Sequence, residues 1–293
     1  MQEFEYCAAR TVREAVSLLA EKGRLARPLA GGTDVLVQMR SGRRQVERLV
    51  DIKGIPDTNQ LSYGPRVGLQ LGAAVPCYRI YQNETVSKMY PGLIDAAALI
   101  GGIQIQGRAT LGGNLCNAAP SADAVPSMIA LGAICVIAGP NGTREMPVED
   151  FCTAPGQTVL GDGEFLVSLR IPPPRPNSGA HYLRFIPRNE MDIAVAGVGS
   201  SVVLDRAKRS FVSARVALAS VAPRPLYVKE AGDVLAGKEV SAKAIEDAAE
   251  AAMAAARPIN DMRGTIVQRR HLVGVLTRRT LREAIQRAGA TAA

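Results

Sequence analysis

The stretch "TLGGNLCNAAPSAD", residues 110–123, holds two glycines, two asparagines and an aspartate between apolar neighbours. Within it, only Cys116 and Asp123 could act as a strong nucleophile or a general base. Glycine permits backbone conformations and close approaches that a Cβ atom would block. The composition of this stretch therefore predicts either a tight turn or a backbone cradle around a ligand.

A second glycine segment, "AGGTD" at residues 30–34, has the same character. Consecutive backbone N–H groups in such a turn form an anion-binding concavity. Threonine and asparagine side chains add donors, and a carboxylate accepts hydrogen bonds from sugar hydroxyls. Together the two segments could hold two phosphates and a ribose. Two tight turns are the alternative that these residues leave open.

The glycine pairs alone carry no signal. Chance gives about three adjacent pairs for a chain with this many glycines, and three occur, at 31–32, 101–102 and 112–113. The signal lies in the residues around them. Thr33 and Asp34 follow one pair, and Thr110 and Asn114 frame another, with Asp123 downstream.

The overall composition is that of a folded protein with room for two or three domains, since the chain has 293 residues, of which 47% are apolar and 21% charged. The absence of tryptophan and the 4% aromatic content argue against stacking on single-stranded nucleic acid. A net charge of +8 suits an anionic partner such as a nucleotide cofactor, an acidic protein or nucleic acid.

The five cysteines form no CxxC pair, and the two histidines lie far apart in the sequence. This pattern argues against a disulfide framework, and against an iron–sulfur or zinc site on this chain. The N-terminus has no signal pattern, and the longest apolar run, within residues 124–138, is too short to span a bilayer. We therefore expect a cytoplasmic protein without a membrane span.

The first 55 residues predict a β–α–β lobe. Thr11 and Glu14 stand at capping-box spacing at the start of a helix over 11–23. Apolar periodicity and turn residues predict the other elements of this lobe, which are strands at 3–6, 27–30 and 47–52 and a short helix at 35–42.

Residues 56–175 predict a second lobe of strands, turns and helical pieces. Its expected elements are a strand at 67–75, a helix over 90–102 that ends at the glycine pair, a helix leading into a strand over 127–139, and a strand at 164–172. The proline-rich segment 172–179 can continue neither a helix nor a sheet, so it predicts the main boundary.

Residues 180–293 predict a third lobe with an antiparallel sheet and two helices. Three strand-like runs, at 180–188, 194–205 and 211–222, precede helices at 241–256 and 265–289. The six arginines of the last helix could indicate nucleic-acid binding, but an amphipathic helix with a solvated basic face is the favoured interpretation.

Other nucleotide and hydrolase signatures are missing. No GxxxxGK[ST] segment occurs, and "GVGSSV" at 197–202 lacks the third small residue of a dinucleotide fingerprint and lies in a strand-like run. No GxSxG segment occurs either.

Taken together, these segments resemble a known family. "PLAGGTDVLVQMRSG", "ATLGGNLCNAAPSADAVPSMIALGA", "FLVSLRIP", "RNEMDIAVAGVG" and "INDMRGTIVQRRHLVGVLTRRTL" are similar to the FAD-binding medium subunit of the xanthine dehydrogenase and carbon monoxide dehydrogenase group of molybdenum hydroxylases. The resemblance covers nearly the whole chain. It implies an α+β fold: a PCMH-type FAD-binding domain of two α/β lobes, followed by a C-terminal α+β domain.

The resemblance also implies which residues bind FAD. The backbone at 31–34 would hold the pyrophosphate, Thr110, Gly113 and Asn114 the flavin and phosphate side, and Asp123 the adenosine ribose. Ile105, Cys116, Leu166 and Arg184 match positions near the flavin ring, and 188–194 matches a mobile loop beside it. The full expected set is Pro28, Leu29, Ala30, Gly31, Gly32, Thr33, Asp34, Val35, Gly101, Ile105, Ala109, Thr110, Gly113, Asn114, Cys116, Asp123, Leu166 and Arg184.

Two departures from the family pattern affect the expected contacts at the flavin edge. Gln106 and Gly107 stand where the family often has an Arg–Asn pair, and Ala119 stands where it often has an acidic residue. The cysteine-bearing insertion of the benzoyl-CoA reductase branch is absent.

The resemblance implies an electron-transfer role with no acid–base catalyst and no metal on this chain. A large subunit would carry the molybdenum cofactor and a small one two [2Fe–2S] clusters, in a dimer of heterotrimers. FAD would pass electrons to NAD⁺, dioxygen, a quinone or another carrier. A stand-alone reductase of the UDP-N-acetylenolpyruvoylglucosamine reductase type, or a nucleotide-binding module whose basic last helix docks nucleic acid, are the alternatives. The substrate, the acceptor and the oligomeric state of the isolated chain do not follow from the sequence.

Overall fold

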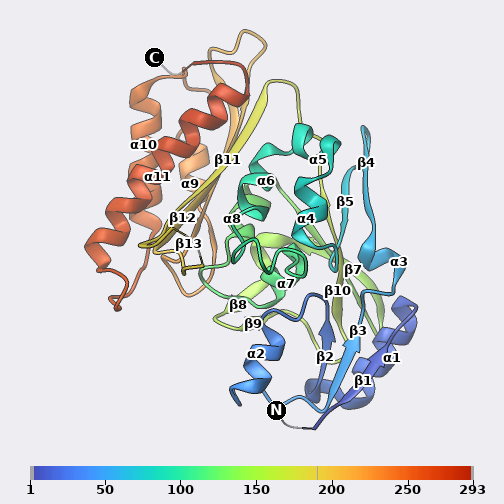
Figure 1. The fold of residues 1–293 in the computed structure, drawn as a ribbon. Coiled ribbons are helices and arrows are strands. Elements are labelled where there is room, and N and C mark those ends of the chain that lie inside the picture. Colours follow the sequence, from blue (N-terminus) through green and yellow to red (C-terminus); the bar gives the residue numbers. More distant parts are fainter. Residues whose placement is uncertain (1–2, 190, 292–293) are drawn as a thin grey trace.

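Three sheets and a two-stranded ribbon organise the described part of the chain, residues 3–189 and 191–291 of a computed structural model (Figure 1). Helices accompany all three sheets, as the predicted α+β class requires, and the predicted class is confirmed. No helix among the described residues is long and apolar enough to cross a membrane.

The N-terminal lobe is a parallel sheet with strand order β1-β3-β2. Thr11 caps the first helix as predicted, since its side chain accepts a hydrogen bond from the Glu14 N–H at 3.1 Å. The first strand begins at Glu5 rather than at residue 3. The elements are β1 (Glu5–Ala8), α1 (Val12–Lys22), a 3-10 turn (Gly23–Leu25), β2 (Ala26–Leu29), α2 (Val35–Arg40) and β3 (Arg48–Asp51).

The middle lobe is an antiparallel sheet with strand order β4-β5-β10-β6-β7. Its strands are β4 (Leu61–Gly64), β5 (Gly68–Gly72), β6 (Ile134–Gly139), β7 (Gly142–Pro147) and β10 (Phe165–Ile171), and the ribbon is β8 (Cys152–Ala154) with β9 (Gln157–Thr158). The connections hold α3 (Pro56–Asn59), α4 (Cys77–Tyr81), α5 (Glu84–Met89), α6 (Pro91–Ala97), α7 (Leu111–Cys116), α8 (Ala124–Ala130) and a 3-10 turn (Val148–Asp150).

Several of these helices differ from the sequence prediction, which gave no separate element for α3, α4, α5 or α7. The helix expected to run to Gly101–Gly102 ends at Ala97, and turns and bends follow to residue 108, with Gly101 at a φ of +60°. The Gln106 side chain, buried in these turns, donates hydrogen bonds to the carbonyls of Ala98 and Ile100, which would otherwise lack partners. A short helix that the sequence analysis did not predict, α7, occupies the opening stretch itself.

The C-terminal lobe is an antiparallel sheet with order β11-β12-β13-β14, covered by helices on both faces. Figure 1 shows α10 and α11 on the outer face, and α6 and α8 of the middle lobe pack on the same strands. Its elements are β11 (Ser178–Phe185), β12 (Ala196–Leu204), β13 (Phe211–Ala219), β14 (Leu226–Tyr227), α9 (Lys229–Asp233), α10 (Ala242–Ala255) and α11 (Ile266–Arg287). The borders at residues 55, 175 and 180 stay predictions.

The middle and C-terminal lobes meet through a half-buried ion cluster. Asp95 of α6 accepts hydrogen bonds from His181 Nδ1 at 2.5 Å and from Arg287 Nη1 at 2.6 Å. These two partners lower the pKa of Asp95 although burial opposes them. Beside this cluster the Gly92 backbone touches Ala180, so the two lobes pack closely.

Removing the Asp95 charge should lower the stability of the protein in a pH-dependent way. Because the folded-state pKa of Asp95 is depressed, its contribution is present above the unfolded pKa of about 3.9 and is lost as the pH falls through the folded value. We expect Asp95→Asn to lower the free energy of unfolding by about 1–3 kcal/mol at pH 7. The difference from wild type in the free energy of unfolding, measured by urea denaturation, should shrink below about pH 4.

Asp233→Asn, which breaks an exposed pair with Lys229, is the control and should lower the free energy of unfolding by under about 0.5 kcal/mol. A pH-independent loss would contradict the role of the charge.

Candidate functional site

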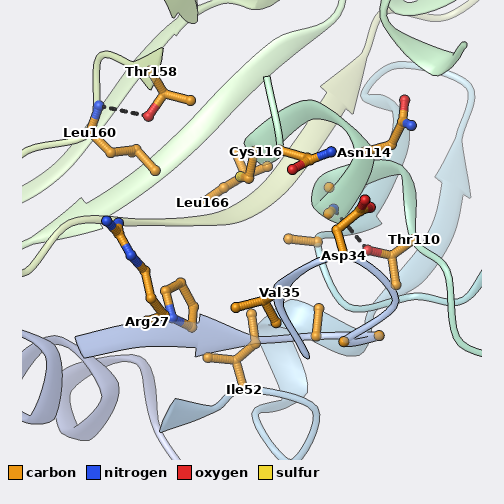
Figure 2. Close-up of a pocket in the computed structure, with 18 of the residues that line it drawn as sticks. Arg27, Asp34, Val35, Ile52, Thr110, Asn114, Cys116, Thr158, Leu160 and Leu166 are labelled. Atoms are coloured by element: carbon orange, nitrogen blue, oxygen red, sulfur yellow. Dashed lines mark hydrogen bonds between the residues drawn. The ribbon is translucent and has the colours of Figure 1, made fainter. Parts of the chain in front are cut away.

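A cavity of about 760 Å³ lies between the N-terminal and middle lobes. This volume is within the roughly 300–1,000 Å³ range of small-molecule sites. Figure 2 shows Arg27, Val35 and Ile52 on the side of β2 and its neighbours, facing Asn114, Cys116 and Leu166 of the middle lobe. The cavity is therefore formed by segments that lie far apart in the sequence.

The backbone of the first glycine segment lies against Arg108 and Ala109, the two residues just before the second segment. A Cβ atom on Gly31 would lie 1.9 Å from the Arg108 carbonyl oxygen and 3.2 Å from the Ala109 nitrogen. Such distances are far below van der Waals contact, so only glycine lets the two backbones come this close. Gly32 has a φ of +76°, a conformation that also favours glycine, and it turns the chain into α2.

The second glycine segment is the start of α7. The Thr110 side chain accepts a hydrogen bond from the Gly113 N–H at 2.8 Å and so caps the helix. The backbone of Gly112 packs against Ala73, because a Cβ atom on Gly112 would lie only 2.6 Å from the Ala73 carbonyl oxygen. The segment 110–123 is thus not a simple turn. It begins with a capped helix, α7, which packs closely against the middle lobe at Ala73.

Side chains reinforce the junction of the two segments. Gln38 of α2 donates a hydrogen bond from Nε2 to the Asn117 Oδ1 at 2.8 Å, just after α7. Asn114 accepts one from the Ala124 N–H at 3.1 Å and so ties α7 to α8. Gln38, Asn114 and Asn117 all line the cavity.

Thirteen of the eighteen predicted site residues line this one cavity. They are Pro28, Ala30, Gly31, Gly32, Thr33, Asp34, Val35, Ala109, Thr110, Gly113, Asn114, Cys116 and Leu166. Leu29, Gly101, Ile105, Asp123 and Arg184 are not among its lining residues. The Leu29 side chain belongs to a small core with Met39, Val46 and Leu49, because alternate residues of a strand face opposite sides.

The structure places the Asp123 side chain in a hydrogen-bonded cluster outside the cavity lining, and its predicted contact with the adenosine ribose stays a prediction. Its carboxylate accepts hydrogen bonds from the Tyr182 hydroxyl at 2.8 Å and from Arg184 Nη1 at 2.6 Å. All three side chains are buried, and burial raises the pKa of Asp123 despite the nearby guanidinium. Asp123 and Arg184 therefore join the middle lobe to β11 of the C-terminal lobe, and neither is among the residues that line the cavity.

The segment predicted to be a mobile loop, 188–194, reaches the turns after α6. Met191 packs against Gly102, where an added Cβ would lie 2.9 Å from the Met191 Cγ. Glu190 of this segment lies outside the described residues.

Sequence reasoning missed two groups of lining residues. One is cationic and consists of Arg24, Arg27 and Arg44; the other is the segment 156–164 after β8. Arg27 stands four residues before Gly31, so its proximity to the first segment was a usable signal. The segment 156–164 includes β9 of a local hairpin with β8, and the Gly156 N–H donates a hydrogen bond to the Ala118 carbonyl at 3.0 Å. That contact between residues distant in sequence has no local pattern that could predict it.

The titratable groups of the cavity do not form a catalytic set. Burial raises the pKa of the Cys116 thiol to about 12, so it is neutral at pH 7 and a poor nucleophile. Burial also raises the pKa of Asp34 and lowers that of Arg27. The site is therefore suited to binding rather than to acid–base chemistry by the protein.

Comparisons with known proteins identify the ligand class. Residues 2–174 match the model of the FAD binding domain in molybdopterin dehydrogenase, and residues 181–284 match that of the CO dehydrogenase flavoprotein C-terminal domain. The chain is 30% identical to a xanthine dehydrogenase FAD-binding subunit of Escherichia coli O157:H7, over 97% of both chains. It is 33% identical to the carbon monoxide dehydrogenase medium chain of Hydrogenophaga pseudoflava, over 96% of both.

A solved structure extends this similarity to the whole fold. The reconstituted CO dehydrogenase from Oligotropha carboxidovorans contains a chain that matches with a TM-score of 0.91 and 31% identity, over 97% of this chain and 98% of that one. The two family models and the full-length relatives together cover nearly the whole chain. The chain belongs to the FAD-binding subunits of the xanthine and CO dehydrogenase type of molybdenum hydroxylase.

Proposed function

We propose that FAD binds in the cavity between the N-terminal and middle lobes, and that the chain relays electrons through it within a larger complex. The observation that carries this proposal is the meeting of both glycine segments in one cavity, in a chain of an FAD-binding family. The electrons would come from [2Fe–2S] clusters of a small partner subunit, and a large partner subunit would carry the molybdenum cofactor. The acceptor would be NAD⁺, dioxygen, a quinone or another carrier.

The residues around the cavity fit a dinucleotide. Backbone at Gly31–Thr33 and at the start of α7 is bare of large side chains, which allows phosphate groups to approach peptide N–H groups. The Asp34 carboxylate lines the same space and can accept hydrogen bonds from a ribose. Arg27 brings a cation whose Nε is buried without a hydrogen-bond partner, as expected where an anionic ligand completes the site.

The chain's own contribution is binding, orientation and shielding. Bound FAD supplies the redox chemistry, while the protein holds it and sets its surroundings. Leu166 and Cys116 give the cavity an apolar wall, and the neutral thiol adds no charge there. We assign no catalytic acid, base or metal ligand to this chain.

The family membership favours this function over the stand-alone reductase. The C-terminal lobe matches the flavoprotein domain of CO dehydrogenase, and its relatives are named as subunits or medium chains. The arginines of α11 do not call for a nucleic-acid role, because Arg269, Arg278 and Arg287 are paired with Asp261, Glu246 and Asp95 respectively. We propose a cytoplasmic heterotrimer, or a dimer of heterotrimers, as the working assembly.

Gly31→Ala should abolish FAD retention, because the added methyl must displace the Arg108 carbonyl and separate the two segments. The measurement is flavin content of the purified chain by absorbance, with the fold checked by circular dichroism. Gly107→Ala is the matched control, since an added Cβ there meets nothing within 4 Å. A folded Gly31→Ala protein with wild-type FAD content would contradict the proposed cavity.

The proposed complex can be tested by affinity purification of the tagged full-length chain from its native host. We expect FAD on the tagged chain, together with a larger molybdenum-containing protein and a smaller iron–sulfur protein in equal amounts. A flavin-containing chain that purifies alone and oxidises NADPH with a substrate of its own would instead support the stand-alone reductase.

A further inference from the structure

Arg27 is the most unusual cation of the cavity. It lies on β2, and Figure 2 shows its guanidinium reaching across the cavity toward Thr158 and Leu160 of the middle lobe. Its Nε is buried and has no hydrogen-bond partner. Among the described residues, no carboxylate lies within ion-pair distance of it.

The surroundings of Arg27 add positive charge rather than remove it. Arg44 and Arg24 line the same cavity, and both disfavour the protonated form of Arg27. Burial acts in the same direction and is the largest cause of its lowered pKa. The Asp162 carboxylate opposes these effects by its attraction, but it lies 3.7 Å from the Arg24 Nε and so is shared with that second cation.

A half-buried guanidinium among like charges has a clear electrostatic cost in the ligand-free protein. A phosphate would remove this cost, since its oxygens pair with arginine in short charge-assisted hydrogen bonds. The glycine segment 30–34, which starts three residues after Arg27, provides backbone N–H groups for the same kind of anion.

We propose that Arg27, supported by Arg24 and Arg44, recognises the phosphate-bearing ADP half of the cofactor. This inference rests on the proposed binding of FAD in this cavity. In this role Arg27 binds the ligand, while its unpaired charge lowers the folding stability of the ligand-free chain. The cation therefore selects for the dinucleotide over flavins that lack phosphate.

The test uses the full-length chain after removal of bound flavin, with FAD, ADP and riboflavin as separate probes. ADP carries the two phosphates without the flavin, and riboflavin carries the flavin without phosphate. For Arg27→Gln we expect ADP and FAD affinities to fall roughly ten- to hundredfold, with riboflavin affinity unchanged. Arg27→Lys should recover part of the loss, because it restores the charge without the planar fork.

The ligand-free unfolding midpoint separates this role from a structural one. Arg27→Gln should keep or raise the midpoint, since it removes an unpaired cation from among like charges. Arg43→Gln, an exposed neighbour outside the cavity lining, should change neither affinity nor midpoint. A lowered midpoint with equal losses for ADP and riboflavin would overturn the inference.

The proposed function and this inference fail in different ways. If the wild-type chain binds FAD and ADP and Arg27→Gln binds both equally well, the role of Arg27 is wrong and the cavity assignment stands. If the wild-type chain binds neither ligand, the cavity assignment is wrong and the role of Arg27 falls with it.

Discussion

The backbone of Gly31 lies against the Arg108 carbonyl, in a space where any Cβ atom would be 1.9 Å from that oxygen. This contact joins a loop of the parallel N-terminal sheet to the turn that leads into α7 of the middle lobe. The cavity lies between those two lobes, so its shape depends on the contact. The Gln38–Asn117 hydrogen bond supports the same junction from the side. The absence of a side chain at Gly31 thus allows the two lobes to form a site together, with lining residues from each.

The C-terminal lobe is joined to the middle lobe by buried and half-buried ion pairs, which lie outside the cavity lining. Arg184 of β11 pairs with Asp123 at the start of α8, and Asp95 of α6 holds His181 and Arg287. Breaking one member of such a pair leaves an uncompensated charge, which is more costly than the pair itself is stabilising. Asp123 lies seven residues after Cys116 of α7, so the charge that fixes the third lobe is close in sequence to the cavity wall.

The sequence predicted the fold class and most of the long elements, and most of the predicted site residues line the cavity. Local signals were sufficient where capping and periodicity decide, as for α1 with Thr11 and α10 with Ser241. They carry no information where a partner distant in sequence decides. Asp123 has the chemistry of a ribose ligand, but its position opposite Tyr182 and Arg184 is set by the packing of two lobes. Arg27 stands close to Gly31 in the sequence, but the missing partner of its Nε is recognised only once its surroundings are known.

The central claim is that the two glycine segments form a single binding unit. Amide hydrogen exchange on the full-length chain, with and without FAD, tests it most directly. We predict that peptides spanning 28–38 and 106–118 gain protection together at the same FAD concentration, while peptides of α10 do not change. Protection of one segment without the other, or of neither, would contradict the account.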